Sequence, residues 1–208
     1  MKNEKLVLVL EGVIVAVICM ALSFIHIEVG QAHFGIQLGL IPLSIYGLRR
    51  GLFPALAAGL VWGVLVLLIV MPQAQSLPAG QILLDYIVAF ACGGAAGQFR
   101  RRLAHMLEDT SADVHVDEAH KHVPDMHGAF LAVVGAGFVA AIARWVFHFI
   151  SGAIFWADAV PQGMSSAFYS FAMNSADAGL NGIILAVVLV LLVQFGRKIF
   201  DPKFPNLP

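Results

Sequence analysis

Charged residues are scarce in this chain of 208 residues. Asp, Glu, Lys and Arg together make up 12% of it, whereas a soluble domain is about one quarter charged. Hydrophobic residues make up 60% of the sequence, and the mean hydropathy is +0.86. This composition excludes an ordinary soluble domain and indicates an integral membrane protein in contact with a lipid bilayer. The formal net charge of −1 gives no reason to expect nucleic-acid binding.

Cysteine is also scarce, and a nucleotide-binding motif is absent. Cys19 and Cys92 both lie in apolar stretches, where a cysteine is typical of a small buried residue and not of a disulfide framework. The phosphate-binding pattern G-x-x-x-x-G-K-[ST] does not occur. If the protein drives active transport, the energy must therefore come from another chain or from an ion gradient. We expect no cofactor.

Long apolar runs dominate the rest of the sequence. A helix needs about 20 mainly apolar residues to cross a bilayer. Six segments qualify as candidate spans: 6–27, 35–48, 51–71, 79–99, 128–154 and 166–196. The first contains Glu11 and lacks a convincing cleavage site, so it is interpreted as a retained span. The second is short and contains Pro42, which favours a broken or tilted helix. We expect an all-α protein with one six-helix membrane domain over residues 1–208.

Basic residues predict the orientation of these spans. Lys and Arg precede span one, separate spans two and three, and follow spans four and six; they are Lys2, Lys5, Arg49, Arg50, Arg100, Arg101, Arg102, Lys121, Arg197, Lys198 and Lys203. The loops near 28–34, 72–78 and 155–165 contain neither residue. By the positive-inside rule, both termini lie in the cytoplasm and the protein is a multi-pass protein of the cell membrane.

Arg144 is the basic residue that breaks this pattern. It lies inside span five, about 15 Å from the outer end at a rise of 1.5 Å per residue. An arginine at that depth is costly and should be paired. Asp177 lies at a similar depth in span six. We expect a buried structural ion pair between Arg144 and Asp177.

Polar and aromatic side chains converge at the outer ends of spans five and six. His148 follows Arg144 by one helical turn, and Trp156 lies at the end of span five. Tyr169 and Asn174 lie in span six, beyond a short loop that holds both helix ends together. The alternatives are a packing role for His148 and an interfacial aromatic role for Trp156. Their convergence favours the lining of a ligand site.

Asp85 and Tyr86 lie early in span four, also near the outer face. A carboxylate beside an aromatic ring suits a cation, because ring faces attract cations and carboxylates accept charge-assisted hydrogen bonds. The alternative for Asp85 is a helix N-terminal cap. In span one, Gly12 and Ala16 form a small-residue pair that could face a partner protein.

The region 100–127 is the one extended polar segment. It contains five histidines, His105, His115, His120, His122 and His127, among several acids. Such clusters can bind transition metals, but no spacing here matches a strong metal motif. We expect a solvated cytoplasmic loop and no metal site.

Several stretches together resemble a known family of transport proteins. These are LRRGLFPALAAGLVWG, LLDYIVAFACGGAAG, FHFISGAIFW and PQGMSSAFYSFAMN. They resemble the thiamine-specific substrate-binding component (S component) of energy-coupling factor (ECF) transporters, over nearly the whole chain apart from the central loop. The resemblance implies a six-helix protein without its own ATPase that captures thiamine from outside. It also implies partners, a transmembrane coupling protein and two ATPase subunits.

The same resemblance implies roles for individual residues. His148, Trp156, Tyr169 and Asn174 match family ligand contacts, Asp85 and Tyr86 fall at the family's Glu-Tyr pair, and Gly12 and Ala16 fall near its partner-contact motif. His33 and Phe34 stand where the family carries a lid tryptophan, and Asp85 is one methylene shorter than the family's glutamate.

Those departures keep open a related heterocycle, such as a pyrimidine precursor of thiamine, as the ligand. A small membrane enzyme using His148 and Asp85 as acid and base is the third hypothesis. No nucleophile, metal triad or nucleotide motif accompanies that pair. We therefore expect a binding protein and not an enzyme.

Overall fold

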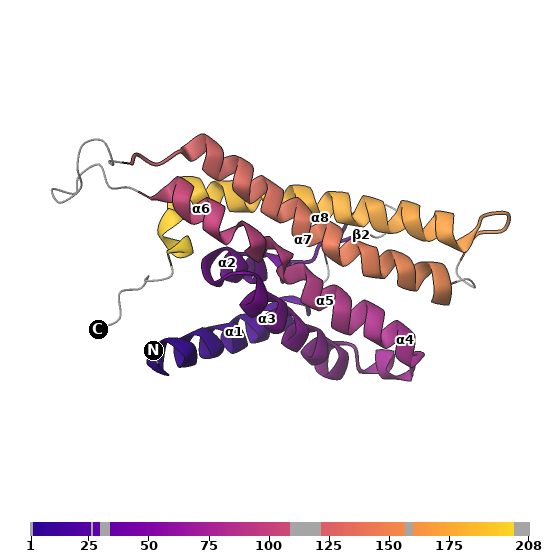
Figure 1. The fold of residues 1–208 in the computed structure, drawn as a ribbon. Helices are drawn as coiled ribbons and strands as arrows, with labels where there is room; N and C mark the ends of the chain where they lie inside the picture. The colour runs from indigo at the N-terminus through magenta and orange to yellow at the C-terminus, as the bar shows by residue number, and fades with distance from the viewer. Residues whose placement is uncertain (1, 26, 30–33, 109–121, 157–159, 202–208) are drawn as a thin grey trace.

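The computed structural model describes residues 2–25, 27–29, 34–108, 122–156 and 160–201. Almost all of them are helical (Figure 1). The α-helices and strands are α1 (Lys2–Leu22), β1 (Glu28–Val29), β2 (Phe34–Gly35), α2 (Leu40–Arg50), α3 (Leu52–Leu65), α4 (Ala79–Ile82), α5 (Ala89–Cys92), α6 (Arg100–Leu107), α7 (Met126–Phe155) and α8 (Ser166–Gly196). Tighter or wider helical turns extend them: η1 (Val66–Val70), η2 (Pro72–Ser76), η3 (Leu83–Val88), η4 (Gly93–Phe99) and η7 (Arg197–Phe200).

Five helical segments in the described part of the chain are long and apolar enough to cross a membrane. They are Glu4–Leu22, Leu52–Val70, Ala79–Leu107, Met126–Phe155 and Ser166–Phe200. The predicted spans 6–27, 51–71, 79–99, 128–154 and 166–196 correspond to them. The third segment runs past its predicted end at 99, because α6 continues the same helical rod through the basic residues.

The predicted helical span 35–48 is wrong at its start. Helix α2 begins only at Leu40, and the residues before it form a short antiparallel pairing in which Glu28 lies opposite Gly35. Pro42 lies in the first turn of α2, where a missing N–H is tolerated. The helix ends at Gly51, whose φ of 103° reverses the chain into α3.

Helix α3 packs on the α4–α6 rod at backbone distance. A Cβ atom added to Gly63 would collide with the carbonyl oxygen of Tyr86, and one added to Gly94 would press on the backbone of Ala55. Small residues recur at four-residue spacing in α3, at Ala55, Gly59 and Gly63. The close approach explains them, because glycine lets helix backbones meet when lipid gives no hydrophobic drive. The contact fixes the rod, and with it Asp85 and Tyr86, against the rest of the bundle.

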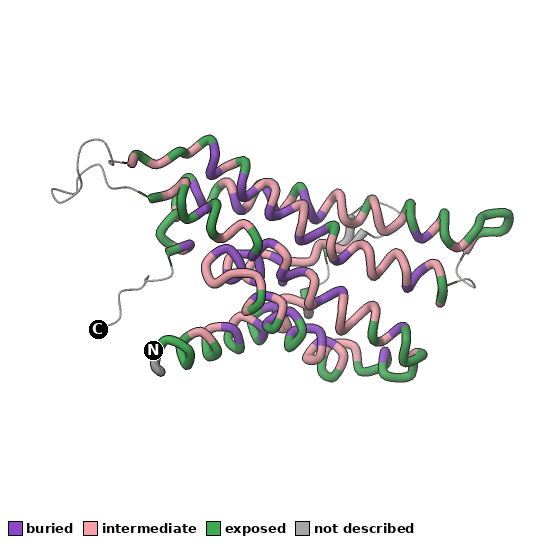
Figure 2. Tube along the Cα trace, in the orientation of Figure 1, coloured by how far each residue is buried: buried purple, intermediate pink, exposed green. Residues whose placement is uncertain are grey.

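Helices α7 and α8 lie side by side as a long antiparallel pair (Figure 1). Each begins with a side-chain cap, since Asp125 accepts from the Gly128 N–H at 2.9 Å and Ser165 accepts from the Phe168 N–H at 3.2 Å. Buried positions follow the inner faces of these helices, and exposed positions follow the outer faces (Figure 2). This pair forms one side of the bundle, opposite α1 and α3.

Gly12 and Ala16 lie on the packed face of α1, which corrects the expectation that they face a partner. The Tyr46 ring lies against Gly12, and Ala16 is fully buried. The Tyr46 hydroxyl donates to the Leu8 carbonyl at 2.8 Å, which holds α1 on α2. The outward face of α1 instead carries branched aliphatic side chains, including the exposed Ile14.

The α3–rod contact makes a testable prediction about stability. Gly63→Ala should destabilise the protein by roughly 1–3 kcal/mol, because the added methyl overpacks a backbone contact. Gly179→Ala is the matched control, since nothing lies within 4 Å of a Cβ atom at that position of α8. The control should keep or slightly raise stability. Thermal unfolding of both purified variants in detergent measures the difference, and equal melting temperatures would contradict the close packing.

Candidate ligand-binding site

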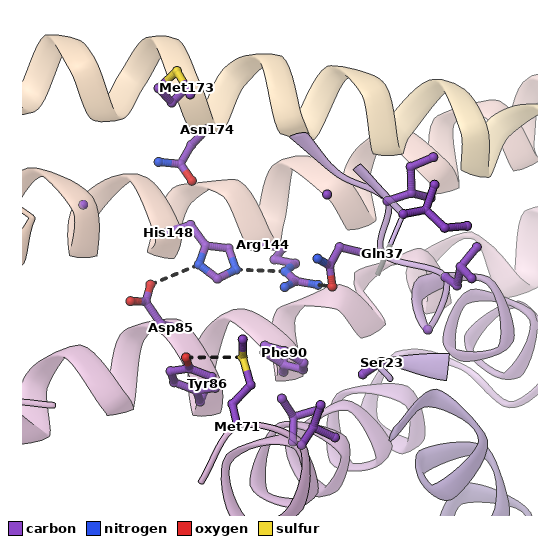
Figure 3. A pocket seen from close by; sticks show the side chains of 18 of the residues that line it. Ser23, Gln37, Met71, Asp85, Tyr86, Phe90, Arg144, His148, Met173 and Asn174 are labelled. Carbon is purple, nitrogen blue, oxygen red and sulfur yellow. Dashed lines mark hydrogen bonds and ion pairs between the residues drawn. The ribbon is translucent and has the colours of Figure 1, made fainter. Parts of the chain in front are cut away.

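A cavity of about 610 Å³ lies between the α4–α6 rod, α7, α8 and the segment that leads into α2 (Figure 3). Six residues predicted from the sequence line it: Asp85, Tyr86, His148, Trp156, Tyr169 and Asn174. The structure thus brings together side chains from three helical segments around one space. The other two predicted contacts cannot be placed in the same way, because His33 and the side chain of Phe34 lie outside the described part of the chain.

A wide helical turn, η3, positions Asp85 and Tyr86. Such π-type turns are frequent at functional sites, because the extra residue re-aims the side chains of the helix. Asp85 does not cap a helix: its Oδ1 lies 3.0 Å from His148 Nδ1, and its Oδ2 accepts from the Ser151 hydroxyl at 2.8 Å. Both carboxylate oxygens are therefore directed to side chains of α7. The alternative interpretation of Asp85 as an N-cap is wrong.

His148 links this carboxylate to Arg144. Arg144 Nε donates to His148 Nε2 at 2.9 Å, while His148 Nδ1 meets the Asp85 carboxylate (Figure 3). A guanidinium can only donate, so Nε2 must be the acceptor and Nδ1 must carry the proton. The geometry therefore assigns a neutral imidazole with its proton on Nδ1, donated to Asp85.

Arg144 is buried, with 9% of the residue exposed, and its guanidinium is held on several sides. Its Nη1 donates to the Gln37 side-chain oxygen at 3.3 Å. Its central carbon lies 4.4 Å from the centre of the Phe90 ring and 5.8 Å from that of Trp62. Both rings are within the range at which aromatic faces stabilise a cation. Hydrogen bonds and ring faces together offset part of the cost of burying this charge.

The predicted direct ion pair between Arg144 and Asp177 is not formed. The hydrogen bonds of Arg144 go to Gln37 and His148, whereas Asp177 Oδ2 accepts from the Asn181 amide at 3.3 Å. Both side chains do line one small cavity between α7 and α8. The positions of Arg144 and Asp177 along their helices correctly predicted that the two residues lie near each other. The guanidinium, however, points along α7 and toward the segment before α2.

Asn174 and Trp156 add polar and aromatic groups to the wall. The Asn174 amide nitrogen donates to the Ser170 carbonyl at 2.9 Å, which leaves its oxygen directed toward the His148 side (Figure 3). Trp156 lines the cavity while its side chain remains 50% exposed. The structure thus places it at the cavity, while the interfacial aromatic position stays a prediction.

Sequence reasoning missed several residues of this site. Ser151 follows His148 by three positions, so a helical-face count would have found it. Trp62 is fully buried, and its Nε1 donates to Ser23 Oγ at 2.9 Å. Its ring face toward Arg144 had no signal in the sequence. The same holds for Gln37, because the segment around it was expected to be helical.

Among the described residues that line this cavity, Asp85 is the one carboxylate, whereas Asp177 lines the small neighbouring cavity. His148 is neutral in the assigned tautomer, and Arg144 donates to Gln37 and His148, so neither forms an ion pair with Asp85. The rest of the lining is mainly apolar and aromatic. A monovalent cation with an apolar, ring-containing body complements such a site.

Within the described residues, no group of three or more His, Cys, Asp or Glu side chains could hold a metal ion. The rings of His105 and His122 stack with their centres 5.0 Å apart at the edge of the polar segment. Its central part, 109–121, lies outside the described residues. The expectations of a solvated loop and of no metal site therefore stay predictions.

A mostly apolar cavity with a few fixed polar groups, set among membrane-crossing helices, defines a multi-pass membrane protein that binds a small molecule. A family model described as "Thiamine transporter protein (Thia_YuaJ)" matches residues 9–201. The chain belongs to this thiamine transporter family, a family of the cell membrane.

Individual relatives agree with that assignment. The thiamine transporter ThiT of Lacticaseibacillus paracasei is 29% identical over 208 aligned residues, which cover 97% of this chain and 94% of that protein. The thiamine transporter ThiT of Bacillus subtilis is 30% identical over 165 residues, covering 79% of this chain and 77% of that protein. The solved structure of ThiT from Listeria monocytogenes superposes with a TM-score of 0.81 at 29% identity, covering 96% of this chain and 100% of that one.

The role of Arg144 can be tested without any ligand. Arg144→Met should lower the free energy of unfolding by roughly 3–5 kcal/mol, because Gln37 and His148 lose a donor and two carboxylates lose their counter-charge. Arg197→Met, at the exposed end of α8, is the matched control and should leave stability unchanged. Thermal unfolding in detergent is the measurement. An Arg144→Met protein as stable as the unmodified one would contradict the account of the site.

Proposed function

We propose that this protein is the thiamine-binding S component of an ECF-type importer. The observation that carries the proposal is the cavity itself. A carboxylate fixed by a neutral histidine and a serine stands beside aromatic rings, and it is the one acidic group among the described residues that line the cavity. Membership of the thiamine transporter family supports the same ligand.

Thiamine has the chemistry that this cavity complements. Its thiazolium ring carries a fixed positive charge, and its aminopyrimidine ring offers hydrogen-bond donors and acceptors. Asp85 would oppose the charge or accept from the amino group, while Tyr86, Trp156 and Tyr169 would stack on the rings. The Asn174 oxygen would supply a directional acceptor. His148 would act mainly by holding Asp85, because both of its ring nitrogens are engaged.

The proposed topology has six membrane-crossing segments in one domain, 1–208, with both termini and the 100–127 loop in the cytoplasm. Helix α2 and the segment before it would make up the second crossing. In support, α1 begins, α6 lies and α8 ends at the same end of the bundle (Figure 1), and these are the ends rich in Lys and Arg. The cavity lies toward the opposite half and would open outward.

Uptake would need other chains. We propose a transmembrane coupling protein and two ATPase subunits as partners, since the sequence carries no nucleotide-binding motif. The outward face of α1, with Ile14 and Val17 exposed, is the surface that would meet the coupling protein in place of Gly12 and Ala16. Relatives named as transporters favour this role over an enzyme. The fully engaged His148–Asp85 pair argues against acid–base catalysis.

Thiamine binding can be measured by tryptophan fluorescence, because Trp156 lines the cavity. Asp85→Asn should weaken binding by about 10- to 100-fold, since a charge-assisted hydrogen bond becomes a neutral one. Asp125→Asn is the matched control, because it makes the same exchange at the far end of α7 and asparagine still caps that helix. No saturable response of the unmodified protein to thiamine would refute the proposed ligand.

The positive charge of thiamine separates it from its neutral relatives. A thiamine isostere in which a neutral thiophene replaces the thiazolium should bind at least about tenfold more weakly, because it brings no positive charge to the Asp85 carboxylate. The free aminopyrimidine alcohol should bind more weakly still, since it lacks both the charge and one ring. Competition against thiamine gives all three affinities. Tighter binding of the free pyrimidine would favour the related-heterocycle hypothesis instead.

A further inference from the structure

Asn181 is a buried amide in an otherwise apolar stretch of α8, outside the residues proposed to touch the ligand. The residue is 5% exposed. Its Oδ1 accepts from the Gln37 backbone N–H at 2.7 Å, and its Nδ2 donates to the Gly35 carbonyl at 2.9 Å. The two partners settle the orientation of the amide, because a backbone N–H can only donate and a carbonyl can only accept.

Through these two hydrogen bonds, the Asn181 amide pairs with the backbone of residues 35–37 as a neighbouring strand would. One amide group takes an N–H and a carbonyl two residues apart on the same edge of an extended segment, as backbone groups do in a sheet. The other side of this segment is held by the chain before it, where the Ile36 N–H donates to the Ile27 carbonyl at 2.8 Å. Strand β2 lies against α8 at this point (Figure 1).

The clamped segment is a wall of the ligand cavity. Residues 35–39 all line it. Among them, Gln37 accepts a hydrogen bond from the Arg144 guanidinium through its side-chain oxygen. Asn181 therefore fixes the backbone that presents Gln37 to Arg144. Asn181 Nδ2 also donates to the Asp177 carbonyl at 3.0 Å, so the amide is held from its own helix as well.

We propose that Asn181 is a positioning residue for ligand binding: it pins the 35–39 wall against α8 so that this wall of the cavity keeps its position around the ligand. This inference rests on the proposed function for its ligand, but the clamp itself exists without one. A residue that only fills space would not need two bonds of opposite polarity to one backbone segment. Leucine, of similar size, would suit a lipid-embedded helix as filler.

Asn181→Leu in the full-length protein tests the clamp. Hydrogen–deuterium exchange at the backbone amides of residues 35–38, without ligand, should rise by at least about tenfold, because the Gln37 N–H loses its acceptor. Stopped-flow fluorescence should show thiamine dissociating at least about tenfold faster, with a much smaller change in association. Asn181→Ala, measured in the same way, guards against a variant that fails to fold.

Leu185→Ala, one turn further along α8 and 1% exposed, is the matched control. It should lower the melting temperature by opening a core cavity, yet leave exchange at 35–38 and the dissociation rate near their original values. Unchanged exchange and dissociation in both Asn181 variants would overturn the inference. A fast-exchanging Asn181→Leu protein, with an unmodified protein that ignores thiamine, would instead uphold the clamp and refute the proposed ligand.

Discussion

The burial of one guanidinium organises this protein. Arg144 lies deep in α7, where an unpaired charge would cost several kcal/mol, so the chain must supply its partners. His148 accepts from it, Gln37 accepts from it, and Phe90 presents a ring face. Because Arg144 can only donate, His148 is forced to hold its proton on Nδ1 and to give it to Asp85. One buried cation thereby fixes the tautomer of a histidine and the direction of a carboxylate.

The fold supplies the frame for this chain of bonds. Glycine contacts set the α4–α6 rod against α3, and the wide turn η3 in that rod aims Asp85 at α7. The long α7–α8 pair carries most of the opposite wall, and Asn181 ties the segment before α2 to it. Each tie joins parts of the chain that are far apart in sequence. The cavity is therefore a property of the whole bundle and not of any one helix.

Much of this arrangement was predictable from the sequence, and the limits have physical causes. The lengths of the apolar runs correctly predicted five helical spans. Helix α8 has its predicted bounds because the Ser165 side chain caps its first turn. Six lining residues could be predicted as neighbours because all of them lie near the outer ends of their spans. Position along a span could not give rotation about a helix axis, so Arg144 was paired with Asp177 instead of Gln37. The extended segment at the start of the apolar run 35–48 was not predicted, because apolar length alone does not separate a strand from a helix and Asn181, which binds this segment, is distant in sequence.

The central claim is the neutral, Nδ1-protonated state of His148, because a neutral histidine leaves the Asp85 carboxylate available to a cationic ligand. Nitrogen-15 NMR of the imidazole, assigned by comparison with a His148→Gln protein, reports this state directly. The account predicts one protonated nitrogen, Nδ1, and one unprotonated acceptor, Nε2, near neutral pH and without ligand. A doubly protonated imidazolium, or a neutral ring with its proton on Nε2, would contradict the hydrogen-bonded chain from Arg144 to Asp85 and the charge argument for a cationic ligand.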